Sequence, residues 1–170
     1  MINITLGKVL LQTGVVDVAS KILIIDDDKN IREVLSLAFE DEGYIVDKAE
    51  SGQEAIAKTN ANFYNVAIVD WRLPDIEGTR LLGQLKETKP KMVKIMLTGY
   101  PSMENAMAAV NERADAFLLK PVDFGILLKK VKDLLKQQEE DRTFNEEKLV
   151  TFIETRAKEI MQVKSTNISQ

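Results

Sequence analysis

Short apolar runs alternate with longer amphipathic segments from residue 21 onward, and no other feature constrains the fold of this chain as strongly. The runs are rich in Ile and Val with little polar alternation, as in strands buried on both faces of a parallel sheet. They cover residues 21–26, 44–49, 66–70, 94–98 and 116–119. Five strand–helix repeats in roughly 120 residues predict a doubly wound α/β domain with right-handed crossovers.

The segments between the runs carry apolar residues at helical spacing, as amphipathic helices do. The first stripe covers residues 31–39 and is followed by Gly43, a residue type that often ends a helix. Ser51 and Glu54 form a capping-box pattern that predicts the start of a second helix. The three later stripes comprise Leu81, Leu82 and Leu85; Met103, Ala106, Met107 and Val110; and Leu127, Leu128, Val131, Leu134 and Leu135.

Two segments lie outside this alternation. Residues 1–20 are apolar and have no evident partner, so an extra strand, an upstream extension and an appended segment all remain open. Residues 138–142, "QEEDR", indicate an exposed break, after which Thr143 and Glu146 repeat the capping-box pattern and predict a sixth helix over about 144–163. We therefore expect an N-terminal extension (1–20), a main domain (21–137) and a helical tail or linker (138–170).

The predicted tail helix carries its own apolar stripe, at the alternating spacing of a short coiled-coil seam. The stripe includes Val150, Ile153, Ala157 and Ile160, with Leu149, Phe152 and Met161 at its side. Fewer than three heptads are present, and an isolated helix of this length is marginal in water. We expect the stripe to be covered either by the chain's own main domain or, with a slight preference, by a second copy.

Composition excludes several kinds of chemistry. The 170 residues include no cysteine and no histidine, which rules out disulfides, thiolate metal sites and a phosphohistidine on this chain. A net charge of -4 argues against a dedicated nucleic-acid binder. No apolar stretch reaches membrane-spanning length, and the N-terminus lacks a secretion-signal pattern, so we expect a cytoplasmic location with no membrane contact.

Polar residues gather where the predicted strands end. Asp26 and Asp27 follow the first strand, Asp70 ends the third, Thr98 ends the fourth and Lys120 follows the fifth. Taken singly, most of them have an ordinary structural explanation, such as a helix cap or a solvated turn, but Asp70 closes a buried run, where a carboxylate without a partner is costly. Taken together they indicate a site, because ligands of open α/β sheets bind at the carboxyl ends of the strands. Three converging carboxylates repel one another unless a hard divalent cation is present, and Mg²⁺ fits best.

Four motifs, "ILIIDDD", "VAIVDWRLPDIEG", "IMLTGY" and "AFLLKP", carry a resemblance over residues 20–137. In order and spacing they resemble the receiver domain of bacterial and archaeal response regulators. The resemblance implies a flavodoxin-like sheet of order 2-1-3-4-5 followed here by a C-terminal helical extension. It also implies a switch in a two-component phosphorelay, which receives its phosphoryl group from a histidine kinase or phosphotransfer protein. Such a switch is not an enzyme beyond its own phosphorylation and dephosphorylation.

The same resemblance implies roles for single residues. Asp70 matches the phosphoacceptor, Thr98 the hydroxyl that moves to the phosphoryl oxygen, and Lys120 the ammonium group that pairs with it. Phe117 matches the switch aromatic. The residues implied to hold Mg²⁺ are Asp26, Asp27, Asp70 and, through its backbone carbonyl, Arg72.

Further expectations follow from the resemblance. A cis peptide is expected between Lys120 and Pro121, and the face formed by the fourth helix, fifth strand and fifth helix is the usual surface for dimers and partners. Arg113 departs from the family, because a glycine usually ends the fourth helix. A non-glycine residue there must accept a left-handed conformation or a different helix end.

Two other functions compete. Asp26 and Asp28 imitate the paired aspartates of haloacid-dehalogenase-like phosphatases, but "KN" follows them where that family expects a threonine or valine, and Asp70 and Lys120 would then have no role. The other alternative is a binding module on the same fold that works without phosphorylation.

Overall fold

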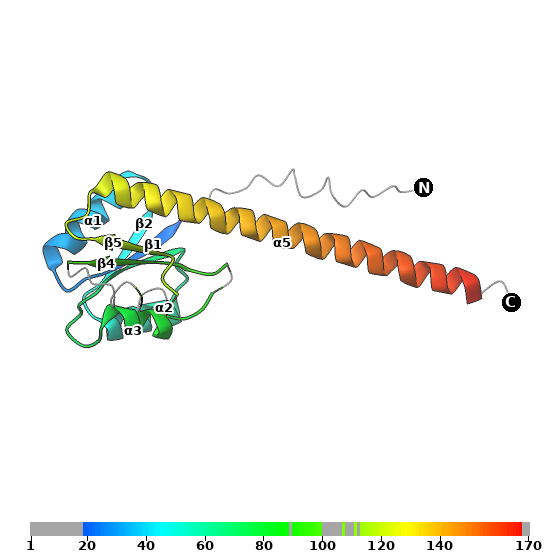
Figure 1. Cartoon of the computed structure of the whole chain (residues 1–170), viewed down its shortest axis with the longest axis horizontal. Coiled ribbons are helices and arrows are strands. Elements are labelled where there is room, and N and C mark those ends of the chain that lie inside the picture. Colours follow the sequence, from blue (N-terminus) through cyan, green and yellow to red (C-terminus); the bar gives the residue numbers. More distant parts are fainter. Residues whose placement is uncertain (1–18, 89, 100–106, 108–110, 112, 168–170) are drawn as a thin grey trace.

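Five parallel strands form one sheet of order β2-β1-β3-β4-β5 in the computed structural model of the chain (Figure 1). The strands are β1 (Lys21–Ile25), β2 (Ile45–Ala49), β3 (Val66–Asp70), β4 (Val93–Thr98) and β5 (Ala116–Leu119). The helices are α1 (Lys29–Asp41), α2 (Gly52–Ala61), α3 (Gly78–Gln84) and α5 (Phe124–Asn167). The predicted fold class and strand order are confirmed.

The structure describes residues 19–88, 90–99, 107, 111 and 113–167, with the backbone alone from residue 157 onward. Most of the predicted N-terminal extension lies outside these residues. So do Met103, Ala106 and Val110 of the predicted fourth helix, whereas Met107 is described as helical and exposed.

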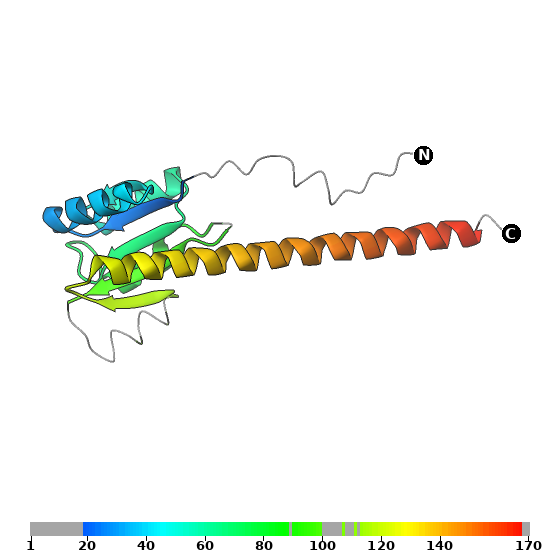
Figure 2. The ribbon, with the colours of Figure 1, turned by 90° about the horizontal axis from the view of Figure 1, so that it is seen from above.

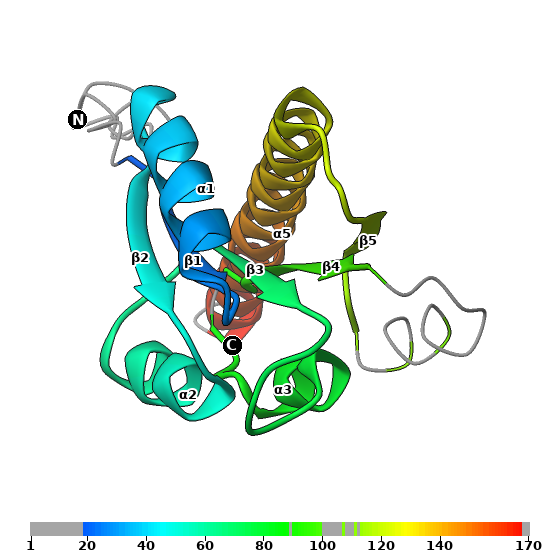
Figure 3. The same ribbon diagram turned by 90° about the vertical axis from the view of Figure 1, so that its left-hand side faces the viewer.

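The sheet is covered on both faces, which explains why its strands read as continuous apolar runs. Helices α2 and α3 cover one face, and α1 and the first part of α5 cover the other (Figure 3). The first layer is built on residues such as Ala55, Leu81, Leu82 and Met96. The second is built on residues such as Leu35, Phe39, Leu127 and Val131.

Local signals at the helix ends act as predicted. The Ser51 hydroxyl accepts a hydrogen bond from the Glu54 backbone N–H at 3.2 Å, which caps α2. Gly43 follows α1 with a φ of 88°, a conformation that glycine adopts at little cost. Asp28 caps α1, its carboxylate accepting from the backbone N–H groups of Asn30 and Ile31.

Helix α5 corrects the prediction for the tail. It runs for 44 residues without interruption, so the break at 138–142 and the separate sixth helix are wrong (Figures 1 and 2). Thr143 does not cap a helix; its hydroxyl donates to the Glu139 carbonyl at 2.9 Å within the same helix. Arg142 bridges Glu139 and Glu146 along the helix surface. Charged residues here support the helix, and the predicted domain boundary at residue 137 falls inside it.

Beyond Gln138 the helix projects away from the sheet (Figures 1 and 2), and residues 139–156 are all exposed. None of the helices among the described residues combines the length and apolar character needed to cross a membrane.

Candidate functional site

The carboxyl ends of four neighbouring strands place the predicted site residues at one edge of the sheet. The register pairs Ile25 with Val69 and Thr98 with Leu119, so the residues that follow β1 and β5 lie level with the ends of β3 and β4. Asp26, Asp70 and Thr98 are buried, at 2%, 8% and 0% exposure. Such burial of two carboxylates is costly unless partners or a cation offset the charge.

Three carboxylates meet at this edge, as predicted. Oxygens of Asp26, Asp27 and Asp70 lie within 4.8 Å of one another, with Asp27 exposed and the other two buried. Oxygen ligands in a small group of this kind suit a hard cation such as Mg²⁺, which usually keeps several waters besides one or two carboxylates. The donor set therefore fits the expected metal.

Lys120 lies between two of these carboxylates. Its Nζ is 2.5 Å from Asp26 Oδ2 and 2.7 Å from Asp70 Oδ1. Burial alone would lower the pKa of Lys120, but the hydrogen bonds and charges of Asp26 and Asp70 outweigh it and raise that pKa. Burial raises the pKa of Asp70, and the bond to Lys120 only partly opposes this rise. Lys120 is thus firmly cationic beside a carboxylate that is easier to protonate than usual.

Backbone contacts hold the first strand's end in place. Asp26 Oδ1 accepts from the Asp28 N–H at 2.9 Å, and the Arg32 guanidinium donates to the Asp26 carbonyl at 2.6 Å. Arg32 is a functional residue outside the predicted set. Its position was available as a signal, because it lies four residues after the α1 cap and so one helical turn along the same face.

The loop from Trp71 to Glu77 is closed tightly beneath Asp70. The Gly78 N–H donates to the Trp71 carbonyl at 2.7 Å, and Arg72 and Glu77 form an isolated antiparallel bridge. A Cβ on Gly78 would lie 2.2 Å from the Asp70 carbonyl oxygen, so only glycine allows this approach. The Arg72 N–H in turn donates to Asp70 Oδ2 at 3.3 Å. The loop therefore carries Arg72 directly beside the acidic cluster.

Three further positions that the motifs single out are Phe117, the Lys120–Pro121 peptide and Arg113. Phe117 is half-buried and packs against the core layer that contains Met96 and Leu81. The peptide between Lys120 and Pro121 is cis. Arg113 has a φ of 64°, so it takes the left-handed conformation that a glycine would adopt more readily.

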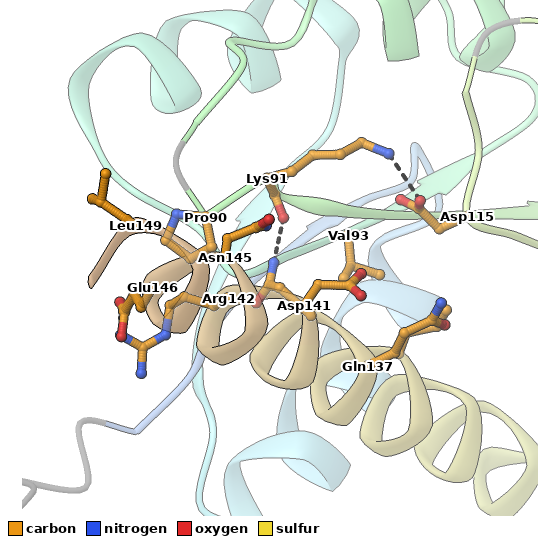
Figure 4. A pocket seen from close by; sticks show the side chains of 12 residues that line it. Pro90, Lys91, Val93, Asp115, Gln137, Asp141, Arg142, Asn145, Glu146 and Leu149 are labelled. Carbon is orange, nitrogen blue, oxygen red and sulfur yellow. Dashed lines mark hydrogen bonds and ion pairs between the residues drawn. The ribbon is translucent and has the colours of Figure 1, made fainter. Parts of the chain in front are cut away.

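Among the described residues, one hollow lies beside the site and another lies away from it. An apolar groove of about 580 Å³ adjoins the site between α1 and the segment that links β5 to α5, and its lining includes Ile31, Val34, Lys120 and Pro121. A larger hollow of about 1050 Å³ lies at the opposite end of β4, where α5 leaves the domain (Figure 4). Polar residues such as Lys91 and Asp115, which pair at 2.9 Å, line it together with apolar ones such as Leu134 and Leu149, and none of the predicted site residues lies there.

Comparison with known proteins supplies the family. The model of the response regulator receiver domain matches residues 22–132. The chain belongs to this family. It is thus a receiver domain of the two-component systems, and its relatives are named as regulatory proteins.

Individual relatives agree with this assignment. A CheY-like receiver domain protein from Methanospirillum hungatei JF-1 is 43% identical, with a TM-score of 0.69 over 72% of this chain and 98% of that one. A response regulator from Burkholderia pseudomallei, solved with a phosphorylated aspartic acid and a calcium ion, is 28% identical with a TM-score of 0.63, covering 72% of each chain. The transcriptional regulatory protein GlrR of Escherichia coli K12 is 34% identical over 116 residues, which is 68% of this chain and 26% of GlrR.

The chain spans between about a quarter and about half of the length of its curated relatives, 26% to 54%. Several of these relatives are transcriptional regulators. They therefore give no support to the expectation that the protein lacks a nucleic-acid partner.

Proposed function

We propose that this protein is a phosphorylation-controlled switch that accepts a phosphoryl group on Asp70 from the phosphohistidine of a sensor kinase or phosphotransfer protein. The observation that carries the proposal is the contact of Lys120 with both Asp26 and Asp70 beside a third carboxylate. A receiver of the same family from Burkholderia pseudomallei is described with a phosphorylated aspartic acid, which supports the same chemistry here.

Asp26, Asp27, Asp70 and the backbone carbonyl of Arg72 are the groups that would hold Mg²⁺. When bound, the ion would neutralise charge on the phosphoryl oxygens and on the acidic cluster. The chain itself provides the cluster in a preformed state, because Asp28 and Arg32 already fix the backbone and side chain of Asp26.

The transfer exchanges one bond for another. An Asp70 carboxylate oxygen forms a bond to phosphorus as the bond from phosphorus to the donor's imidazole nitrogen breaks, and the electron pair leaves with the imidazole. Lys120 favours the ionised, nucleophilic form of Asp70, against the burial that raises the Asp70 pKa. Its ammonium group is also placed to offset the charge on the transferring oxygens.

The aspartyl phosphate would shift the conformational equilibrium of the rest of the domain. An aspartyl phosphate adds negative charge and strong acceptors within reach of the end of β4. The Thr98 hydroxyl would follow these acceptors, and Phe117 on the neighbouring strand would move into the space it leaves. The affected surface would be the one formed by β5, α5 and the segment between β4 and β5, which we propose as the surface for partners.

Intact mass after incubation with acetyl phosphate tests the central step. Wild type with Mg²⁺ should gain one phosphoryl group, and Asp70→Asn should gain none. Equal gains by the two proteins would refute Asp70 as the acceptor. A wild type that gains no mass under these conditions would favour the phosphorylation-independent binding module.

The haloacid-dehalogenase alternative is disfavoured by Asp28. That chemistry needs the second aspartate of the pair in the site, whereas Asp28 Oδ1 caps α1 through the N–H groups of Asn30 and Ile31.

For the projecting part of α5 we propose a second copy of the chain as partner. Leu149, Val150, Phe152 and Ile153 are each more than half exposed, at 59%, 52%, 60% and 57%. Val150 lies fifteen residues beyond Leu135, the last α5 residue packed on the core. At 1.5 Å per residue the unbroken helix carries it about 22 Å further, and there the stripe is exposed rather than packed on the core.

A cysteine-free chain makes this partner testable. Val150→Cys should form a disulfide-linked dimer under mild oxidation if two helices run parallel, because seam positions then meet within disulfide range. Thr155→Cys, on the opposite side of the helix, is the matched control and should stay monomeric on a non-reducing gel. Equal cross-linking of the two variants would contradict a dimer through this stripe.

A further inference from the structure

Asp75 joins two parts of the receiver that are far apart in the sequence. It lies in the loop between β3 and α3, and its two carboxylate oxygens accept from the backbone N–H groups of Gly52 at 2.9 Å and Gln53 at 2.8 Å. Those two residues begin α2, just after its Ser51 cap. The Gly52 and Gln53 bonds lower the pKa of Asp75, so it is ionised at neutral pH. The loop is thereby tied to the neighbouring helix by a bidentate contact.

The fit between loop and helix is close as well as polar. A Cβ on Gly52 would lie 2.2 Å from Ile76 Cγ2, so the start of α2 has room for the loop only because residue 52 is glycine. Ile76 itself packs against the core layer on the α2–α3 side of the sheet. Asp75 and Ile76 together seat the tip of the loop on α2.

The same loop carries Arg72, three residues before Asp75. At its base the loop is closed by the Gly78 N–H and the Arg72–Glu77 bridge, while Arg72, Pro74 and Glu77 are exposed. The Asp75 contact is therefore an anchor at the tip of a segment whose polar residues face solvent. Arg72 thus lies between the closed base of the loop and its anchored tip.

We infer that Asp75 is a positioning residue for the metal site, because it fixes the loop that carries Arg72, whose backbone carbonyl is a proposed ligand beside Asp70. The inference rests on the proposed function. Mg²⁺ demands near-ideal octahedral geometry with short oxygen distances, so a small displacement of one ligand weakens binding. Groups that orient metal ligands commonly change affinity by about 10-fold or more when removed.

The competing explanation is that Asp75 only stabilises the start of α2, as an anion at a helix N-terminus does. Glu54 allows the two explanations to be separated. It lies in the first turn of the same helix, and its carboxylate accepts from the Glu50 N–H at 2.8 Å and pairs with Lys58. Glu54→Ala therefore weakens the start of α2 without removing a bond to the β3–α3 loop.

The experiment is a Mg²⁺ titration of the full chain followed by the fluorescence of Trp71, the single tryptophan. Asp75→Ala should raise the Mg²⁺ dissociation constant about 10-fold, as loss of an orienting group does. Asp75→Asn, which keeps one oxygen acceptor, should recover part of that loss. Glu54→Ala should have the same Mg²⁺ dissociation constant as wild type. For every variant the midpoint of the titration is compared, not the amplitude of the fluorescence change.

An unchanged midpoint in Asp75→Ala, or equal shifts in Asp75→Ala and Glu54→Ala, would overturn the positioning role. Asp27→Ala removes a proposed ligand and distinguishes this result from failure of the proposed function. If wild type responds to Mg²⁺ and Asp27→Ala does not, the metal site stands whatever Asp75→Ala shows. If neither responds, both the metal site and the inference are overturned.

Discussion

Replacing Lys120 with methionine should destabilise the receiver strongly in the absence of Mg²⁺. Lys120 Nζ lies 2.5 Å and 2.7 Å from carboxylates that are only 2% and 8% exposed. Without it, Asp26 and Asp70 face each other unpaired, with oxygens within 4.8 Å. At an effective dielectric constant near 20, one such pair repels by roughly 3 kcal/mol. Removing one partner of a buried ion pair typically costs about 3–5 kcal/mol.

We therefore expect Lys120→Met to lower the free energy of unfolding by about 3 kcal/mol. This value is the lower end of that range, because Asp70 can take up a proton and so remove one of the two unpaired charges. For a chain of this size that corresponds to a fall of roughly 10 °C in the melting temperature. Urea unfolding followed by Trp71 fluorescence, with the m-value checked for constancy, measures the change.

Two further variants make the test specific. Lys91→Met removes a surface pair whose side chains are 47% and 26% exposed, and it should cost no more than about 1 kcal/mol. Adding Asp70→Asn to Lys120→Met removes one of the two unpaired charges, so the double variant should be more stable than Lys120→Met alone. The reasoning is refuted if Lys120→Met costs no more than Lys91→Met, or if Asp70→Asn destabilises it further.

Three other predictions concern pH, backbone strain and switching. Because burial raises the folded-state pKa of Asp70, its contribution to stability is present at acid pH and is lost as the pH rises through that pKa. Without Mg²⁺, Asp70→Asn should gain stability over wild type as the pH rises, and a constant difference in urea midpoints would contradict this. Arg113→Gly should raise stability by about 1 kcal/mol, since it relieves a φ of 64°, and calorimetry showing a lower melting temperature would argue otherwise. Phosphorylation should change hydrogen exchange over residues 99–125, so identical protection before and after would exclude the proposed switch.

The sheet and the acidic cluster were predictable for a simple reason. Uninterrupted Ile and Val runs have no polar face, so they fit only strands covered on both sides. Parallel strands end at one edge, so residues such as Asp26, Asp70 and Lys120 had to converge there once the strand order was known. Asp28 belonged to the same acidic run, yet only its backbone geometry shows that it is a helix cap.

Contacts between distant elements account for what could not be predicted. Lys94 opens the "KIMLT" part of β4 and is only 1% exposed, because its Nζ donates to the Leu82 carbonyl at 2.7 Å at the end of α3. No local sequence pattern around Lys94 predicts that the Leu82 carbonyl will be its partner. The residues at 139–142 are exposed, as their charge indicates, but they are helical because exposure does not require a loop. Glutamine, glutamate and arginine are good helix formers, and a charged exposed segment can be helical throughout.

Because α5 is one continuous helix, a small movement at its base is amplified at its far end. The same helix that packs Leu127 and Val131 into the core continues to Asn167 without a joint. About 30 residues beyond the domain amount to about 45 Å of rigid rod, so a tilt of about 5° at the base displaces the tip by about 4 Å. A small change in how the base of α5 packs on the domain can therefore produce a large displacement of the distant end of the helix, far from Asp70. Inserting a flexible glycine pair at residue 138 would leave the phosphorylation chemistry intact and remove this mechanical output.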